Sequence, residues 1–262
     1  MLNCYIPRRA TPQELGKSSD DSQATEGRRT LSANPRGDGR GALDLRRVFM
    51  EVGVVKQAAG SAYVECNHTK VLCVVHGPHT QSSGDSMYSE EGRLRCDFRY
   101  APFAQPTGRH DFRGQGDDER DLSALLQQTL VASVQVQRLT KSVVDVHCMV
   151  MQADGGELGV AACCASMALA NAGIELFDLV AACSVGCLGS EVVLDPTWEE
   201  ETGGSGTMML ATMQSTQQVT QWWQRGRLDA QTAAQALEFC TDGCTTMHAM
   251  MQTTLASSLD GQ

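Results

Sequence analysis

A segment of small side chains, residues 158–172, places the strongest constraint on how this chain can fold. It is rich in Ala, Cys and Met, and this composition predicts a helix that its neighbours pack closely. Gly173 follows at the position where helices commonly end in the left-handed conformation. We therefore expect other elements of the fold to lie tightly against this helix.

Strand-like segments lie on both sides of this helix in the sequence. They alternate apolar and polar residues or form short β-branched runs, and both patterns are typical of β-strands. Mostly consecutive strands with a few helices predict an α+β fold, with mixed sheets and helices packed on one side. We expect strands near residues 46–55, 60–66, 70–78, 93–103, 142–152, 179–188, 191–195 and 207–213, with loops over 78–91 and 105–116.

Two more helices are expected. One of them covers residues 229–257 and follows a short helical turn that contains Trp222 and Trp223. These patterns place a single domain over residues 41–262, after a mobile polar N-terminal arm over residues 1–40. The other helix lies earlier in the sequence and begins with acidic residues, which suit a helix N-terminus. It is amphipathic, because apolar residues recur at helical spacing: Leu122, Leu125, Leu126, Leu130 and Val134.

Charge is distributed unevenly along the 262 residues. The net charge is −10, yet residues 142–262 contain 2 basic and 14 acidic side chains and so carry −12 by themselves. This excludes a self-sufficient basic nucleic-acid surface in that half. No stretch approaches the roughly 18 consecutive apolar residues of a membrane-spanning helix, and residues 1–10 lack the apolar core of a signal peptide. We expect a soluble, intracellular protein with no membrane partner.

Cysteine is frequent, with 11 residues, but the positions favour a role in packing. Several cysteines lie inside apolar runs, where a free thiol behaves as a small hydrophobic side chain. Cys183 and Cys187 fall in a predicted strand, and Cys240 and Cys244 fall on the apolar face of a predicted helix. Core packing is therefore favoured over a zinc site, and we expect no metal and no cofactor.

Two polar turns are candidate sites. The glycine-rich turn at residues 153–156 lacks the lysine of a P-loop and by itself predicts only a turn. Asp195 is followed by Glu199, Glu200 and Glu201, a group that could bind a divalent metal or transfer protons. A solvated acidic turn is the simpler interpretation, and we favour it.

Six segments, taken in order, resemble the RNase PH family. They are GSAYVECNHTKVLCVVHGP, RCDFRYAPFA, DERDLSALLQQTL, VMQADGG, VAACSVG and VLDPTWEEE, and the resemblance covers about residues 46–201. It implies the RNase PH fold, which is similar to ribosomal protein S5 domain 2. Within the family, the chain is most similar to the RNase PH-like ring subunits of the eukaryotic RNA exosome.

The resemblance also implies a phosphate site that has degenerated. In active members the Gly-Gly turn continues into Thr-Arg, and a cation and backbone N–H groups hold the phosphate that attacks RNA. Here the turn runs Gly155, Gly156, Glu157, Leu158. A glutamate about 4 Å from a phosphate oxygen repels it by roughly 4 kcal/mol at an effective dielectric constant of about 20. The matching part of the preceding helix, residues 124–131, has no cation.

The general-acid region of the family matches residues 194–201. Asp195 supplies the first carboxylate of the family pattern, and Glu200 supplies the next. Glu201 stands where the pattern has an aspartate, so its side chain is longer by one methylene. Without a bound nucleophile these groups are predicted to be relics or parts of a structural turn. No catalytic residue is assigned.

The resemblance therefore implies a non-catalytic subunit of the exosome core ring. Its partners would be the other RNase PH-like subunits of a hetero-hexameric ring, an S1-domain cap subunit and RNA in the ring channel. Nucleus, nucleolus and cytoplasm are the expected locations. Two alternatives stay open: an active phosphate-dependent 3′-to-5′ exoribonuclease, and a scaffold outside the exosome.

RNA contact, if it occurs, is expected from basic residues of the first half. Period two places Arg93, Arg95 and Arg99 on one face of a strand, and Arg109 and Arg113 follow in the next loop. A solvated strand face or an intersubunit ion-pair surface explains the same pattern equally well.

Overall fold

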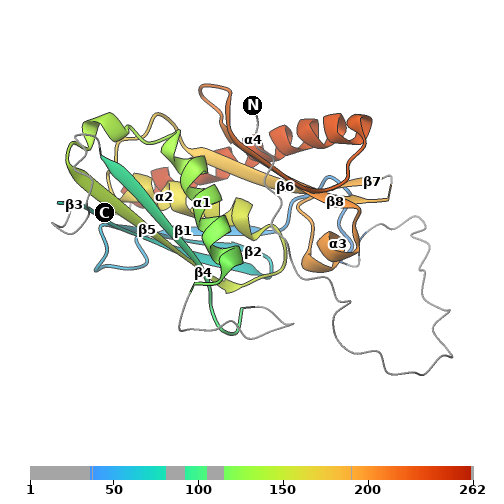
Figure 1. Ribbon diagram of the computed structural model, residues 1–262, viewed down its shortest axis with the longest axis horizontal. Coiled ribbons are helices and arrows are strands. Elements are labelled where there is room, and N and C mark those ends of the chain that lie inside the picture. The colour runs from blue at the N-terminus through green and yellow to red at the C-terminus, as the bar shows by residue number, and fades with distance from the viewer. Residues whose placement is uncertain (1–35, 37, 81–91, 105–114, 190, 261–262) are drawn as a thin grey trace.

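The fold is given by a computed structural model that describes residues 36, 38–80, 92–104, 115–189 and 191–260 (Figure 1). The first half contains β1 (Val48–Val52), β2 (Gly60–Cys66), β3 (Thr69–Thr80), β4 (Arg93–Tyr100), α1 (Asp117–Val131), the short 3₁₀ helix η2 (Val136–Arg138), β5 (Ser142–Gln152) and α2 (Glu157–Asn171). The second half contains β6 (Val180–Leu188), β7 (Glu191–Leu194), α3 (Trp198–Gly203), β8 (Gly206–Met213), β9 (Gln218–Gly226) and α4 (Ala230–Asp260).

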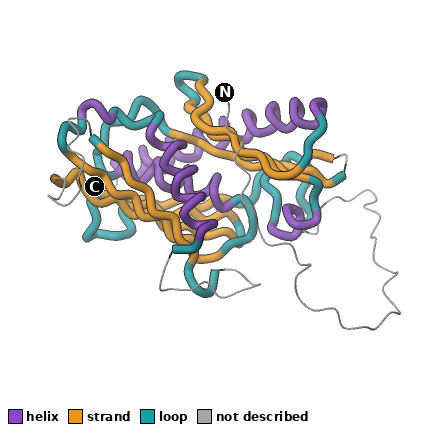
Figure 2. The backbone as a smooth tube through the Cα atoms, in the orientation of Figure 1, coloured by secondary structure: helices purple, strands orange, loops and turns teal. Residues whose placement is uncertain are grey.

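These strands form two sheets, which Figure 2 shows in orange. The five-stranded sheet has the order β1-β2-β3-β5-β4, and its strands are antiparallel except for the parallel pair β4 and β5. The four-stranded sheet has the order β7-β6-β8-β9 and is antiparallel throughout. The predicted α+β class with a mixed sheet is confirmed.

Helix α2 joins the two sheets, and its small side chains allow the close packing that the sequence predicted. The Cys164 thiol donates to the carbonyl oxygen of Ala62 in β2 at 3.1 Å, and the Cys163 thiol donates to that of Ala182 in β6 at 3.4 Å. The approach to β2 is close enough to require a glycine there, because a Cβ on Gly60 would lie 2.4 Å from a backbone oxygen of α2. One hydrophobic core therefore runs from one sheet through α2 to the other.

Helices lie on one face of the five-stranded sheet. Cys73, Cys148 and Phe98 are neighbours across β3, β5 and β4. Cys73 meets the backbone of α2, and the backbone N–H of Phe98 donates to Ser123 of α1 at 2.9 Å. The prediction of helices on one side therefore holds for this sheet.

The four-stranded sheet is covered on both faces. Ser184 in β6 lies in a pocket with residues of α1 and α2, whereas its neighbour Cys183 points to the other face and meets Gly243 of α4. Figure 1 shows α4 as the long helix along the upper side of the molecule. The cysteine pairs of β6 and α4 are buried, which confirms their predicted role in packing. Burial likewise raises the pKa of the Cys66 thiol to about 12, so this thiol stays neutral in the core.

Two local predictions are wrong. Trp222 and Trp223 lie in β9 and pair with Leu210 and Met209 of β8, where a helical turn was expected. Aromatic and β-branched residues favour strands, and a turn over residues 214–217 brings this segment back along β8. The strand β3 also continues to Thr80, beyond the expected loop start at residue 78, because it pairs again with β5 after an irregularity.

Contacts between the N-terminal segment and the domain begin before residue 41. Arg36 is buried and donates to the carbonyl oxygen of Leu194 at the end of β7, and Arg40 donates to the carbonyl oxygen of Asp195. Residues 1–35 of the predicted arm lie outside the described residues, so the division at residue 40 stays a prediction. No helix in the described part of the chain combines the length and apolarity that crossing a bilayer requires.

The buried ion pair between Arg46 and Asp195 ties three segments together. The guanidinium donates to both carboxylate oxygens, at 2.9 and 2.6 Å. It also donates to the backbone oxygens of Asp154 and Gly155 and to the hydroxyl of Thr69. Burial opposes the charge of Arg46, but the adjacent carboxylate outweighs this and raises the pKa of the guanidinium above its ordinary value.

We predict that Arg46→Met lowers the free energy of unfolding by about 3–5 kcal/mol, because it leaves the Asp195 carboxylate buried without its partner. Urea denaturation of the full chain measures the change. Arg46→Met combined with Asp195→Leu should recover part of the loss, since no unpaired charge then remains. The matched control is Arg120→Met, which breaks an exposed pair with Asp117 and should leave the midpoint unchanged. An equal loss in Arg46→Met and the control would contradict the prediction.

Candidate functional site

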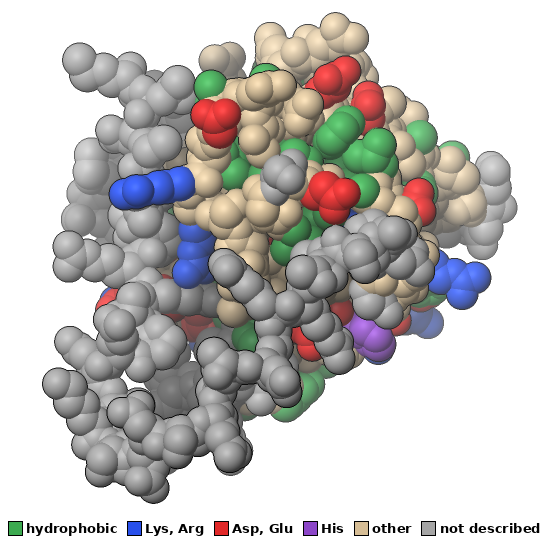
Figure 3. All heavy atoms as spheres, turned by 90° about the vertical axis from the view of Figure 1, so that its right-hand side faces the viewer, with side chains coloured by type: hydrophobic (Ala, Val, Ile, Leu, Met, Phe, Trp, Pro, Cys, Tyr) green, Lys and Arg blue, Asp and Glu red, His purple; other side chains and the backbone are tan. Residues whose placement is uncertain are grey.

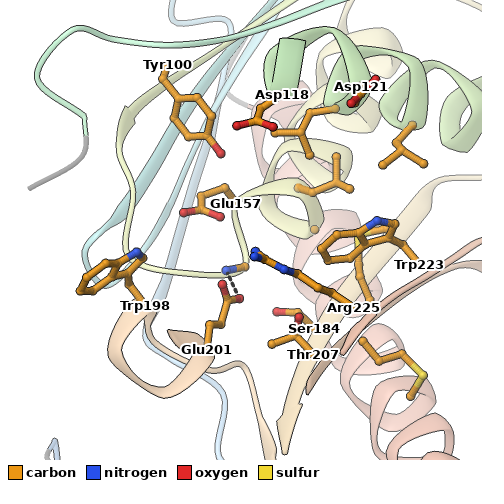
Figure 4. A pocket seen from close by; sticks show the side chains of 17 residues that line it. Tyr100, Asp118, Asp121, Glu157, Ser184, Trp198, Glu201, Thr207, Trp223 and Arg225 are labelled. Atoms are coloured by element: carbon orange, nitrogen blue, oxygen red, sulfur yellow. Dashed lines mark hydrogen bonds between the residues drawn. The ribbon is translucent and has the colours of Figure 1, made fainter. Parts of the chain in front are cut away.

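A pocket opens where the two sheets and three helices meet (Figure 4). Helices α1, α2 and α3 and strands β4, β6, β8 and β9 contribute to its walls, which enclose a cavity of about 90 Å³. Apolar side chains form part of the wall, while aromatic and charged groups project into it. The groups that matter chemically are Tyr100, Glu157, Trp198, Glu201, Trp223 and Arg225.

The glycine turn that precedes α2 forms one end of this pocket. Gly155 and Gly156 have φ angles of 84° and 66°, a region that favours glycine. A Cβ on Gly155 would lie 2.6 Å from the backbone oxygen of Pro196, and one on Gly156 would lie 2.8 Å from the Ser184 hydroxyl. The turn thus presses against the segment before α3, and the backbone N–H of Gly156 faces the pocket at the α2 N-terminus.

A carboxylate already occupies the N-terminus of α2. The backbone N–H of Gly156 donates to Oε1 of Glu201 at 2.9 Å, as the dashed line in Figure 4 marks. An N–H group at a helix start is a favourable partner for an anion. The chain therefore satisfies this donor with its own side chain.

The two residues that were predicted to spoil a phosphate site both line the pocket. Glu157 is the first residue of α2 and projects into the cavity, and the apolar side chain of Leu158 is buried in its wall. The part of α1 over residues 124–131 contributes Leu125 to the same wall. Both residues therefore lie at the pocket, and their effect on phosphate stays a prediction.

Each of the predicted relic carboxylates has a structural partner. Asp195 pairs with Arg46, and Glu201 accepts from the glycine turn. Glu200 accepts from the backbone N–H of Thr197 at 2.9 Å in a capping box at the start of α3, and it lies 3.5 Å from Arg36. Of the two roles left open, these contacts support parts of a structural turn.

Sequence reasoning missed several residues of the pocket, among them Arg225 and Trp223. Arg225 and Trp223 project into it from β9, and in Figure 4 the Arg225 side chain extends toward the glycine turn and Glu201. The available signal was strand periodicity, which puts residues 223 and 225 on one face, but the segment was assigned to a helical turn. Only the pairing of β9 with β8 brings this face to α2.

The pocket carries an excess of negative charge. Its described lining residues include four carboxylates, Asp118, Asp121, Glu157 and Glu201, and one basic side chain, Arg225. Figure 3, which views the molecule from the end that carries α3, likewise shows acidic side chains scattered among apolar and uncharged ones. In the described ranges no group of His, Cys, Asp and Glu is arranged to hold a metal ion.

The arginines considered for RNA contact lie elsewhere. Arg95 and Arg99 are exposed on the outward face of β4, as period two predicted, and Arg93 begins that strand with partial exposure. Arg99 pairs with Asp97 on the same face at 2.9 Å. Arg109 and Arg113 lie outside the described residues, and RNA contact by any of these arginines stays a prediction.

Comparison with known proteins places this geometry in a family. The chain matches the 3′ exoribonuclease (RNase PH) family, domain 1 over residues 44–175 and domain 2 over residues 178–243. It is 36% identical over 223 residues to the "Exosome complex component RRP41-like" of Arabidopsis thaliana, with 85% of each chain covered. It is 33% identical over 227 residues to the human "Exosome complex component MTR3", with 80% of this chain and 82% of the relative covered.

Solved structures agree on the fold. Rice Rrp46 superposes with a TM-score of 0.75 at 24% identity, over 84% of this chain and 100% of that chain. A chain of the Archaeoglobus fulgidus exosome with RNA bound to the active site superposes with a TM-score of 0.72 at 22% identity, over 82% and 92%. The expected RNase PH fold is confirmed, and the chain belongs to the RNase PH family of 3′ exoribonucleases and their exosome-component relatives.

Proposed function

We propose that this chain is a non-catalytic structural subunit of the RNA exosome core ring. Similarity to exosome components over most of its length supports the ring assignment. The observation that carries the non-catalytic assignment is the hydrogen bond from Gly156 to Glu201, because it fills the anion position at the α2 N-terminus with a carboxylate. Glu157 and Leu158 beside it replace the polar and cationic groups that phosphorolysis requires.

Three effects in the pocket act against phosphate binding. The Glu201 carboxylate competes for the backbone donor, Glu157 adds a second negative charge, and Leu158 leaves an apolar wall in place of a cation. Arg225 is a single opposing cation. Since the pocket retains a net negative charge, both inorganic phosphate and the phosphodiester of RNA are repelled.

We predict that the chain releases no nucleoside diphosphates from RNA and inorganic phosphate. The variant Glu157→Thr/Glu201→Ala should bind inorganic phosphate at least about tenfold more tightly than the unmodified chain, because it removes two charges at a distance where each costs up to roughly 4 kcal/mol. Isothermal titration calorimetry measures the binding, and chromatography of the reaction products measures phosphorolysis.

The control is Glu199→Ala, which removes one exposed charge from α3 outside the pocket and should leave phosphate affinity unchanged. Nucleoside diphosphates formed by the unmodified chain would overturn the non-catalytic assignment and favour the active exoribonuclease.

The remaining alternative, a scaffold outside the exosome, differs in its partners. A ring subunit should co-purify with five related RNase PH-like chains at equal stoichiometry and with an S1-domain cap subunit. We predict this composition for the native complex, measured by intact-complex mass spectrometry. Recovery of the chain without the other ring subunits would reject the ring assignment. The proposed locations are the nucleus, the nucleolus and the cytoplasm.

The exposed arginines of β4 have three interpretations in such a complex: RNA contact, an intersubunit ion-pair surface or a solvated strand face. The second is favoured, because Asp97 and Asp145 lie on the same face and bring negative charge next to Arg95 and Arg99. RNA contacts need a continuous positive field, and this face offers an alternating one.

We predict that Arg95→Glu/Arg99→Glu leaves RNA crosslinking along the channel of the assembled ring unchanged. Crosslinking of labelled RNA to reconstituted complexes makes the measurement, and the unmodified complex gives the reference yield. A clear drop in crosslinks with the ring still intact would instead assign RNA contact to these arginines.

A further inference from the structure

The pocket between α1 and the start of α2 contains carboxylates from both helices. In Figure 4, Asp118 and Asp121 project from α1 above the cavity, and Glu157 projects from the start of α2 below them. Together with Glu201 they make four carboxylates, of which the single basic side chain, Arg225, can neutralise one. Three negative charges therefore remain in one concave surface, where low-dielectric walls concentrate their field. Such a surface attracts a cation.

Two of these carboxylates have no partner within the described part of the chain. Arg120 lies close to Asp118 in the sequence, yet it pairs with Asp117, which is outside the pocket lining. Among the described residues, no side-chain hydrogen bond or ion pair engages Asp118 or Glu157. Each lies in the first turn of its helix, where the helix dipole favours a carboxylate but leaves its charge in place. Both are therefore available to a ligand.

Aromatic side chains border the space between these carboxylates. Figure 4 shows Tyr100 on one side of the cavity, next to Asp118, and Trp223 on the other side. The face of an aromatic ring attracts a cation, and a planar guanidinium also stacks on it. A guanidinium carries five N–H donors in a flat fork, so one group can donate to carboxylates on two sides, whereas an ammonium is a compact point charge. A guanidinium is the better match.

The size of the cavity limits what it can enclose. Its volume of about 90 Å³ is well below the roughly 300–1,000 Å³ of pockets that enclose drug-sized ligands. The group inside it is therefore about the size of one side chain.

The indole N–H of Trp223 indicates which kind of molecule carries the cation. Its Nε1 is buried in the pocket wall and has no acceptor among the described residues. A buried donor without an acceptor costs free energy, and a ligand that brings an oxygen to this wall removes that cost. The carbonyl groups of a peptide supply such oxygens, whereas a simple alkylguanidine has none.

We propose that this pocket binds the side chain of an arginine residue that belongs to a peptide ligand. The guanidinium donates to Asp118 and Glu157, and a carbonyl oxygen of the peptide accepts from Nε1 of Trp223. The inference rests on the non-catalytic assignment, because phosphorolysis requires an anion in the same space.

Isothermal titration calorimetry of the full chain with N-acetylarginine N-methylamide, a peptide-like probe, tests the proposal. The probe should bind in the submillimolar range, and its neutral citrulline analogue should bind at least about fivefold more weakly. Asp118→Asn and Glu157→Gln should each weaken binding of the probe by at least about fivefold, the effect of one charge pair at about 4 Å in water. Asp117→Asn is the matched control, because it makes the same change one residue away, outside the lining, and should leave the affinity unchanged.

Butylguanidinium separates a peptide from a free amine as the source of the cation. It has the same charged group without the carbonyl oxygens, so it should bind about two- to tenfold more weakly than the peptide-like probe. Trp223→Phe should remove this difference, because the indole donor is then absent. Equal binding of the two cationic probes by the unmodified chain would reject the peptide as the ligand.

Titration with inorganic phosphate keeps this inference distinct from the non-catalytic assignment. If neither the arginine probe nor phosphate binds, the arginine site is wrong and the assignment stands. Phosphate binding with release of nucleoside diphosphates would overturn the assignment and this inference together. Equal losses in Asp118→Asn and Asp117→Asn, or equal binding of the citrulline analogue, would reject the arginine site.

Discussion

The ion pair between Arg46 and Asp195 organises the centre of this molecule. Arg46 lies just before the first strand, and Asp195 follows β7, so the pair closes a connection of 149 residues. The same guanidinium holds the backbone of the glycine turn before α2. Since that turn positions the α2 N-terminus and the pocket wall, the geometry of the whole site depends on one buried charge pair. Removing either partner of a buried ion pair leaves an unpaired buried charge and strongly destabilises the fold. The many hydrogen bonds of this pair compensate for the solvation that both charges lose on burial.

The pocket brings the glycine turn before α2 and a carboxylate of α3 together at the start of one helix. The glycines keep their left-handed conformation and still press against the acidic turn before α3. The anion at the helix start is the Glu201 carboxylate, which belongs to the same chain. Because Glu201 belongs to the same chain, its carboxylate binds Gly156 without the entropic cost of association and is always present. It therefore competes effectively with free phosphate. The carboxylates that resemble a general-acid region each have a partner within the fold.

The two sheets have different roles in the fold. The four-stranded sheet is covered on both faces, by α1 and α2 on one side and by α4 on the other, and its central strands are buried. The five-stranded sheet has helices on one face alone in the described residues, and its outward face carries exposed apolar side chains, such as Phe49 and Met149, next to charged ones. A sheet of this kind is stable within the chain yet still offers a surface on which another protein can gain free energy by association.

The sequence by itself determined the α+β class, the small-residue helix, the packing role of the cysteines and the two substitutions at the glycine turn. These are local properties, since periodicity, side-chain size and the residues of one turn suffice to state them. Tertiary structure alone decided that Arg225 and Trp223 enter the pocket, because the pairing of β9 with β8 sets their direction. It also decided that Arg46 holds Asp195 and that Glu201 reaches Gly156. Such pairings join residues from 45 to 149 positions apart, and their partners are fixed by the packing of the core rather than by any local pattern.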